Sequence, residues 1–147
     1  MSTDAAVEPK TRQLVVFTLG ADDYGVPIAM VQEIIRHTAP RPIPGSPMHV
    51  QGVINLRGRI IPVVDLRARF GVVAAPPADA KIVIVEMGDL TVGVVVDEVR
   101  EVLTVGADRC ERPPEGAGDA DYIDAVAKLE GRLLVILDMP RLLGDVA

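Results

Sequence analysis

The chain has 147 residues, of which 49% are hydrophobic and 3% aromatic, so Val, Ile and Leu must fill the core of one domain or two very small ones. A net charge of −6 argues against a nucleic-acid partner, and the single Cys110 excludes an intrachain disulfide and a multi-thiolate metal site. No apolar run is as long as a membrane span and the N-terminus lacks a signal pattern, so we expect a cytoplasmic protein without membrane insertion.

The first third of the chain predicts a tail, two strands, a helix and a loop. Residues 1–11 are small and polar, and we expect them to be disordered. Strands are expected over 13–20 and 24–28. Apolar positions 30, 31, 34 and 35 have helical spacing, so the pattern predicts a short amphipathic helix over 29–37. Residues 39–48 contain four prolines and predict no regular structure.

A β-hairpin is predicted over residues 53–66, which read VINLRGRIIPVVDL. Its tip falls at Arg57 and Gly58, and Gly58 is expected to take the positive φ that such a turn demands. Asp65 is expected to cap a following helical turn, which Gly71 would end.

After a linker over 72–80, a similar pattern of elements begins again. We expect strands at 81–87 and 90–96, extended chain over 99–105, a loop over 111–121, a hairpin over 122–138 and a closing helical turn over 139–144.

The second half of the chain therefore repeats the first. Shifted by 73 residues, 53–66 aligns with 126–139, with the matching pairs Val53/Val126, Leu56/Leu129, Gly58/Gly131, Arg59/Arg132 and Asp65/Asp138. In the same way 24–34 aligns with 92–102, with the matching pairs Gly25/Gly93, Val31/Val99 and Glu33/Glu101.

Two copies of about 60 residues each bury little apolar surface alone, so they should close into barrels and pack together. The sequence predicts an all-β fold of two small five-stranded barrels, of SH3-like type, that share an apolar seam. We expect one domain over 12–144, with subdomains at about 12–71 and 80–144, a possible crossover of the chain between them, and a tail at 145–147.

The repeat also serves as an internal control for single residues. Gly58 and Asp65 recur in the second copy, as residues that the fold requires should. Arg57 does not recur, because Glu130 stands at its place. The fold tolerates either charge there, so Arg57 is either a partner-binding residue or a solvated charge at a hairpin tip.

The titratable residues predict no catalytic or metal site. His37 and His49 lie twelve residues apart, with no acidic or thiol partner nearby in sequence. Cys110 has no neighbouring His, and a turn explains the pair Asp97-Glu98. We therefore expect no metal, no cofactor and no enzymatic activity.

The predicted helix over 29–37 has two interpretations. Its apolar residues Val31, Ile34 and Ile35 can pack on their own barrel. They can also leave part of their surface uncovered, as a groove for a partner helix.

Several stretches resemble the CheW-like family of bacterial chemotaxis. They are FTLGADDYGVPIAMVQEI, VQGVINLRGRIIPVVDLRARFG, VGVVVDEVREVL and YIDAVAKLEGRLLVILD, and the resemblance covers about 12–144. Its most specific part is the NLRG-x-I-x-PVVDLR block. The resemblance implies two intertwined five-stranded β-barrels, in agreement with the repeat.

The resemblance also implies a non-catalytic adaptor that is a monomer when free and is recruited to membrane-associated receptor arrays. It would couple a cytoplasmic histidine kinase of the CheA type to the cytoplasmic tip of methyl-accepting chemoreceptors. The regulatory domain of the kinase would pack barrel against barrel, and the receptor tip would lie in an apolar groove between the subdomains.

Particular residues carry over from the family by position. Arg57 would lie at the receptor–kinase junction, and Gly52 is associated with kinase binding. The residues matched to receptor contact or to the groove are Val31, Glu33, Ile34, Val94 and Val99.

The resemblance has one clear departure. Gly116 stands where family members often carry a hydrophobic residue for a second kinase contact, so the ring-closing contacts of the family do not carry over. Two other functions remain open: an adaptor of a related chemosensory pathway, such as twitching or gliding motility, and a small-molecule sensor that uses the groove as a pocket.

Overall fold

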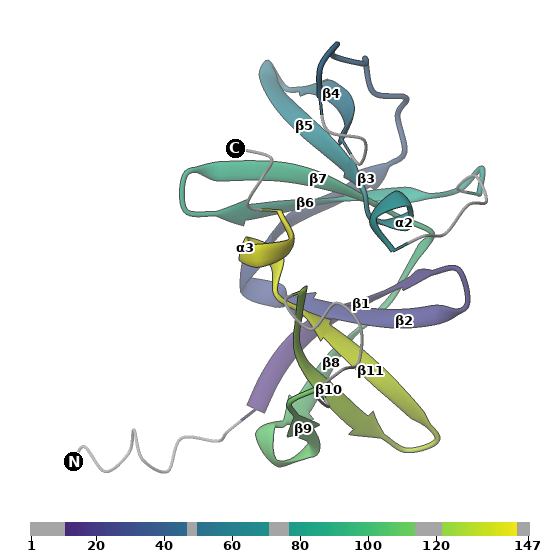
Figure 1. Cartoon of the computed structure of the whole chain (residues 1–147), viewed down its shortest axis with the longest axis vertical. Coiled ribbons are helices and arrows are strands. Elements are labelled where there is room, and N and C mark those ends of the chain that lie inside the picture. The colour runs from purple at the N-terminus through teal and green to yellow at the C-terminus, as the bar shows by residue number, and fades with distance from the viewer. Residues whose placement is uncertain (1–10, 47–49, 71–76, 114–121, 144–147) are drawn as a thin grey trace.

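The strands form two sheets, stacked one above the other in the computed structural model (Figure 1). The structure describes residues 11–46, 50–70, 77–113 and 122–143. The six-stranded sheet has the order β8-β1-β2-β11-β10-β9, and its strands are β1 (Thr11–Leu19), β2 (Asp22–Pro27), β8 (Glu98–Gly106), β9 (Cys110–Glu111), β10 (Ile123–Leu129) and β11 (Arg132–Leu137). The five-stranded sheet has the order β3-β6-β7-β5-β4, and its strands are β3 (Val31–Arg36), β4 (Val50–Leu56), β5 (Arg59–Asp65), β6 (Lys81–Met87) and β7 (Leu90–Val96).

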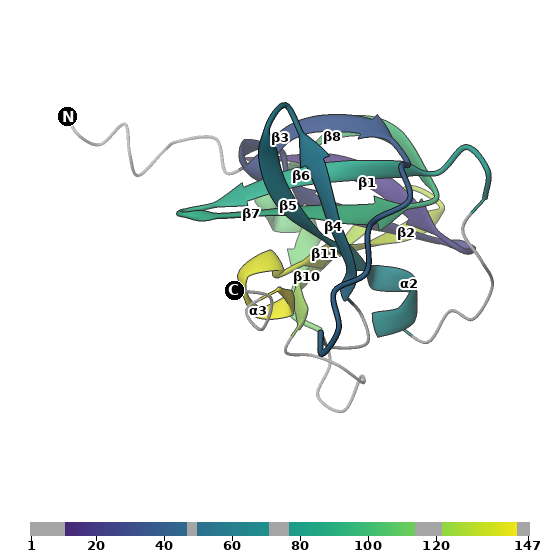
Figure 2. The ribbon, with the colours of Figure 1, turned by 90° about the horizontal axis from the view of Figure 1, so that it is seen from above.

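Four short helical segments connect these strands. They are the 3-10 turns η1 (Ile28–Met30) and η2 (Ala107–Arg109) and the single-turn helices α2 (Leu66–Arg69) and α3 (Met139–Leu142). Helices α2 and α3 lie between the two sheets in Figure 1, and the view from above shows both toward one side of the molecule (Figure 2).

Each sheet draws on both sequence copies. The hairpin β1–β2 of the first copy pairs with β8 and β11 of the second, and the hairpin β6–β7 of the second copy pairs with β3 and β5 of the first. The chain thus crosses between the sheets after β2 and again after β7. The ranges 12–71 and 80–144 name the two sequence copies, while each sheet is shared between them.

The parallel strand pairs of the two sheets have the same register, as the internal repeat predicts. In the parallel pair β5–β7, Val63 lies opposite Gly93, and in the parallel pair β11–β2, Ile136 lies opposite Gly25. These are the same positions in the two copies. The repeat seen in the sequence is therefore a pseudo-twofold relation between the sheets.

Buried side chains form three clusters. One lies in the six-stranded sheet around Leu14, Val16, Leu134 and Ile136, and one in the five-stranded sheet around Ile54, Ile61, Val63, Ile82, Ile84 and Val95. The largest lies between the sheets and includes Phe17, Val26, Val64, Leu66, Val83, Val94, Met139 and Leu142. The predicted all-β architecture with two subdomains and a shared apolar seam is confirmed, but one of the two sheets has six strands where five were predicted, because β9 adds to the edge of β10.

The predicted helix over 29–37 is wrong. Residues 28–30 form a 3-10 turn, and Val31–Arg36 is strand β3, which pairs antiparallel with β6. Exposure alternates along β3, with Val31, Glu33 and Ile35 half-buried and the residues between them exposed. Ile34 is apolar although it faces outward, and next to Ile35 it creates the adjacent apolar pair that imitates helical spacing.

The predicted hairpins and helix caps are present. Asp65 Oδ1 accepts a hydrogen bond from the Arg67 amide at 2.8 Å, and Asp138 Oδ1 accepts one from the Arg141 amide at 3.1 Å. Gly58 has φ 84° and Gly131 φ 78°, the positive values expected at both tips. Thr11, which was expected in the disordered tail, is the first residue of β1. The rest of that tail, the helix ends at 71 and 144, His49, Gly116 and the tail at 145–147 lie outside the described residues.

Candidate surface at the β4–β5 hairpin tip

The tip of the β4–β5 hairpin holds Arg57 in an uncommon backbone conformation. Leu56 pairs with Arg59, so Arg57 and Gly58 form a two-residue turn with φ 52° and φ 84°. Positive φ at both central residues is the type I′ arrangement, whose twist matches that of the flanking strands. Asn55 Oδ1 accepts a hydrogen bond from the Gly58 amide at 2.9 Å and supports the turn. The hairpin thus fixes where the Arg57 side chain begins.

Arg57 forms a two-pronged ion pair with Glu33 on β3. Its Nη1 lies 2.5 Å from Glu33 Oε2 and its Nη2 lies 2.8 Å from Oε1. The hydrogen bond from Arg57 lowers the pKa of Glu33, and the same bond raises the pKa of Arg57. Both groups therefore stay charged near neutral pH. The Arg57 side chain remains 71% exposed, so its guanidinium is both oriented and accessible.

Apolar side chains are exposed on the strands that carry this ion pair. Ile34 on β3 is 41% exposed, and Ile60 on β5 is 65% exposed. A hollow of about 360 Å³ lies between the end of β3 and β4, and the residues that line it include Ile35, Val53 and Leu56. An exposed charged pair, exposed isoleucines and a partly apolar hollow on one sheet are features of protein-binding surfaces.

The second sheet carries equivalent positions with different chemistry. Glu130 replaces Arg57, and Arg132 instead binds Glu101 at 2.7 Å and Asp23 at 3.0 Å. Leu133 and Val102, the counterparts of Ile60 and Ile34, are also exposed. The apolar surface thus recurs on both sheets, whereas the arginine at the hairpin tip belongs to the first copy.

The other residues that the resemblance singled out do not all lie at this surface. Val31 and Val99 are half-buried and pack against the seam between the sheets, and Val94 lies within that seam at 1% exposure. Val94 is therefore positioned to support the fold, and a partner does not reach its side chain in this conformation.

The backbone packing around position 52 explains why this residue is glycine. It has φ 146°, and a Cβ atom there would lie 2.1 Å from the carbonyl oxygen of Arg41. Arg41 and Val53 form a β-bridge through two backbone hydrogen bonds of 2.8 and 2.9 Å. Only glycine permits this close approach, so close packing of the backbone explains the residue without a partner.

Two features of the structure were missed from sequence. The alternation of β5 could have placed Ile60 outward, because Ile61 and Val63 are buried. Asp97 was assigned to a turn, but it forms an ion pair with the buried Arg67. The sequence around each residue gives no indication of a contact between residues 30 positions apart.

Within the described ranges, no group of three or more His, Cys, Asp or Glu side chains could hold a metal ion. None of the helices in that part of the chain is long and apolar enough to cross a membrane.

Comparison with known proteins identifies the family. The family described as CheW-like domain matches residues 13–147. The chain belongs to the CheW-like family. It is 36% identical to the chemotaxis protein CheW of Klebsiella aerogenes, over 95% of this chain and 86% of that protein, and 36% identical to that of Bacillus subtilis, over 86% and 83%. The structure also matches that of the scaffolding protein TtCheW from Thermoanaerobacter tengcongensis with a TM-score of 0.82. The two chains are 35% identical, and the match covers 86% of this chain and 88% of TtCheW.

Proposed function

We propose that this CheW-like protein is a non-catalytic adaptor that couples a cytoplasmic histidine kinase of the CheA type to the tip of methyl-accepting chemoreceptors. Membership of the family supports a role as a chemotaxis scaffold. The observation that carries the finer proposal is the exposed Arg57–Glu33 pair, on a sheet whose strands β3 and β5 also expose Ile34 and Ile60. No step of chemistry in this chain is required, because the signal is a change in how the bound partners are held.

In this proposal the ion pair orients Arg57 before a partner arrives. A guanidinium that is already held in place loses less conformational freedom when it binds a carboxylate or carbonyl group. The exposed isoleucines contribute apolar burial, and Arg57 contributes specificity for an acidic or carbonyl group on the receptor or the kinase. Glu33 then orients Arg57, whereas Val31, Gly52, Val94 and Val99 support the fold more than they contact a partner directly.

The test is isothermal titration of the protein with two partners from the same cell, the regulatory domain of the kinase and a receptor-tip fragment. Wild type should bind each one saturably, in the micromolar range or tighter. Arg57→Glu should fold normally and weaken binding of one partner at least tenfold. Arg12→Glu is the matched control, because it makes the same charge change at an ion-paired arginine on β1.

Two results would count against the proposal. If neither partner gives a heat of binding while all proteins are folded, the proposed coupling function is wrong. Equal weakening by Arg12→Glu and Arg57→Glu would show a general effect of charge and no particular role for the hairpin tip.

A second candidate is an adaptor in a related chemosensory pathway. The resemblance leaves this pathway open, and relatives of the chain are not all named as chemotaxis proteins: Protein PilI of Pseudomonas aeruginosa is 32% identical over 56% of this chain and 47% of that protein. Titration against the regulatory domain of each histidine kinase of this type in the cell would separate the two. The pathway is the one whose kinase binds most tightly.

A further inference from the structure

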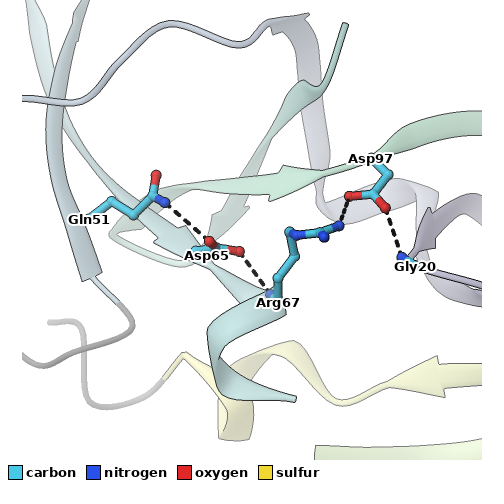
Figure 3. A network of polar contacts seen from close by, with 5 residues as sticks. All are labelled: Gly20, Gln51, Asp65, Arg67 and Asp97. Atoms are coloured by element: carbon cyan, nitrogen blue, oxygen red, sulfur yellow. Dashed lines mark hydrogen bonds and ion pairs between the residues drawn. The ribbon is translucent and has the colours of Figure 1, made fainter. Parts of the chain in front are cut away.

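A buried polar network joins elements of both sheets through α2 (Figure 3). Arg67 on α2 is 3% exposed and forms an ion pair with Asp97. Asp97 lies between β7 and β8, where the chain crosses from the five-stranded to the six-stranded sheet. Its other carboxylate oxygen accepts a hydrogen bond of 2.7 Å from the amide of Gly20 in the β1–β2 turn.

Further contacts fix both ends of this network. The Asp97 amide donates to the carbonyl oxygen of Thr18 on β1 at 2.9 Å. On the other side, Asp65 caps α2 through the Arg67 amide and accepts a hydrogen bond of 3.1 Å from Gln51 on β4. One continuous chain of directional contacts therefore runs from β4, through α2 and the crossover, to the β1–β2 hairpin.

A stacked aromatic pair makes a second contact between the α2 region and the six-stranded sheet. Tyr24 on β2 and Phe70, just after α2, have ring centroids 5.3 Å apart and ring planes at 12°. Helix α2 follows β5 of the five-stranded sheet, and β2 belongs to the six-stranded sheet. The aromatic contact and the ion pair thus fasten the same helix to the opposite sheet.

The internal repeat shows that the fold does not require this ion pair. At the equivalent junction, Pro140 of α3 stands in the place of Arg67, and Ala29 stands in the place of Asp97. There α3 is held by Met139 and Leu142, which are buried in the seam. Both junctions bury apolar side chains, Leu66 at α2 and Met139 at α3, and the α2 junction adds the Arg67–Asp97 ion pair.

Apolar packing and buried ion pairs have different physical consequences. Apolar contacts in the seam are non-directional, and they constrain the angle between the sheets only through the close packing of their side chains. A buried ion pair adds little net stability compared with apolar side chains of similar volume, but its atoms must meet in one geometry. That geometry involves Arg67, Asp97 and Gly20, which come from both sheets and their crossover.

We propose that the Arg67–Asp97 pair is an orientation latch, which holds the two sheets at one relative angle and so presents surfaces on both sheets to partners together. The latch itself is a property of the free protein. Its consequence for partners rests on the proposed adaptor function, in which two proteins bind at the same time.

The first test measures the angle without any partner. Nitroxide labels are placed at Glu86→Cys on β6 and Lys128→Cys on β10, two exposed strand positions on different sheets, in a Cys110→Ser background. Electron–electron double resonance then gives the distribution of distances between the labels. With Arg67→Met and Asp97→Asn combined, this distribution should at least double in width, while Arg67→Lys keeps it narrow.

Control variants make the result decisive. Arg12→Gln breaks an arginine–aspartate pair with Asp124 that lies within one sheet, and it should leave the distribution unchanged. If the double variant does not fold, Asp97→Asn alone decides, because its amide oxygen can still accept from Gly20 while the charge is lost. An unchanged width in a folded variant overturns the latch.

The second test measures partners. In the double variant, the affinity for the kinase domain or the receptor-tip fragment alone should change less than twofold. Binding of the second partner to the complex with the first should weaken at least fivefold. If wild type binds neither partner, the adaptor function fails while the distance measurement still decides the latch. If the second partner binds the variant complex as well as it binds the wild-type complex, the consequence for partners is wrong.

Discussion

Substitution of Gly52 by alanine tests whether this glycine acts through the fold. The added Cβ atom would lie 2.1 Å from the carbonyl oxygen and 2.5 Å from the carbonyl carbon of Arg41, and both are backbone atoms that cannot rotate away. The residue would also have to keep φ near 146°, a conformation that costs a side chain roughly 1–3 kcal/mol.

Relief of the clash requires that the bridge between Arg41 and Val53 opens. This bridge has two backbone hydrogen bonds, each with a net contribution of about 0.5–1.5 kcal/mol. Together with the backbone strain, the expected loss in the free energy of unfolding is about 2–6 kcal/mol. That is a large share of the roughly 5–15 kcal/mol that stabilises a typical domain.

Urea denaturation followed by circular dichroism measures this loss, and Gly88→Ala is the matched control. Gly88 has φ 61° with nothing near the position of an added Cβ, so alanine there meets backbone strain without a clash. Gly52→Ala should therefore cost clearly more than Gly88→Ala. Equal losses would refute the role of the close approach, and a stable Gly52→Ala protein that fails to bind the kinase domain would make Gly52 a contact residue.

Three further predictions concern ionisation and the two cores. Because Arg57 lowers the pKa of Glu33 below its usual 4.5, the folded protein binds fewer protons there than the unfolded chain. The free energy of unfolding should therefore fall as pH decreases below about 4.5, and it should fall less steeply in Arg57→Gln. Urea titrations across about pH 3–6 measure this difference. Burial, with a smaller contribution from Asp22, raises the pKa of Tyr24 above 10.0, so stability should fall as pH rises past that value and Tyr24→Phe should reduce the fall in the same assay. Leu134→Ala and Ile61→Ala remove equivalent buried side chains, one from each sheet, and each should cost about 2–5 kcal/mol in thermal or urea unfolding; a loss from only one of them would contradict equal roles for the two cores.

The sequence contained enough information for the repeat, the hairpins and the caps, because these depend on local chemistry. Gly58 and Asp65 recur in the second copy, and each does there what its residue type favours. Alternation of apolar residues shows which face of a strand is buried, but it does not show which strand lies beside it. The sequence therefore predicted only a possible crossover of the chain, and it did not show that the β1–β2 and β6–β7 hairpins are exchanged between the copies.

The candidate surface was predicted in part for the same reason. The repeat marked Arg57 as the residue that the fold does not require, but the contact with Glu33 crosses from the hairpin tip to β3. The sequence predicts a helix where strand β3 lies, because the outward-facing Ile34 is apolar and interrupts the alternation of apolar and polar residues. The exposed apolar residue Ile34 thus hid the local structure that carries it.

The two departures from internal symmetry are linked through a single segment of the chain. Arg57 lies at the tip of the β4–β5 hairpin, and Arg67 lies on α2, which follows β5 directly. Strand β5 joins them, since Asp65 at its end caps α2 and its first residues form the hairpin. The hairpin tip and the ion pair at the crossover are therefore connected by one hydrogen-bonded strand. In the second copy, the equivalent segment has Glu130 at the tip in place of Arg57 and Pro140 on its helix in place of Arg67. The two copies share one scaffold, and the first copy alone combines an exposed arginine with a buried one that reaches across the seam.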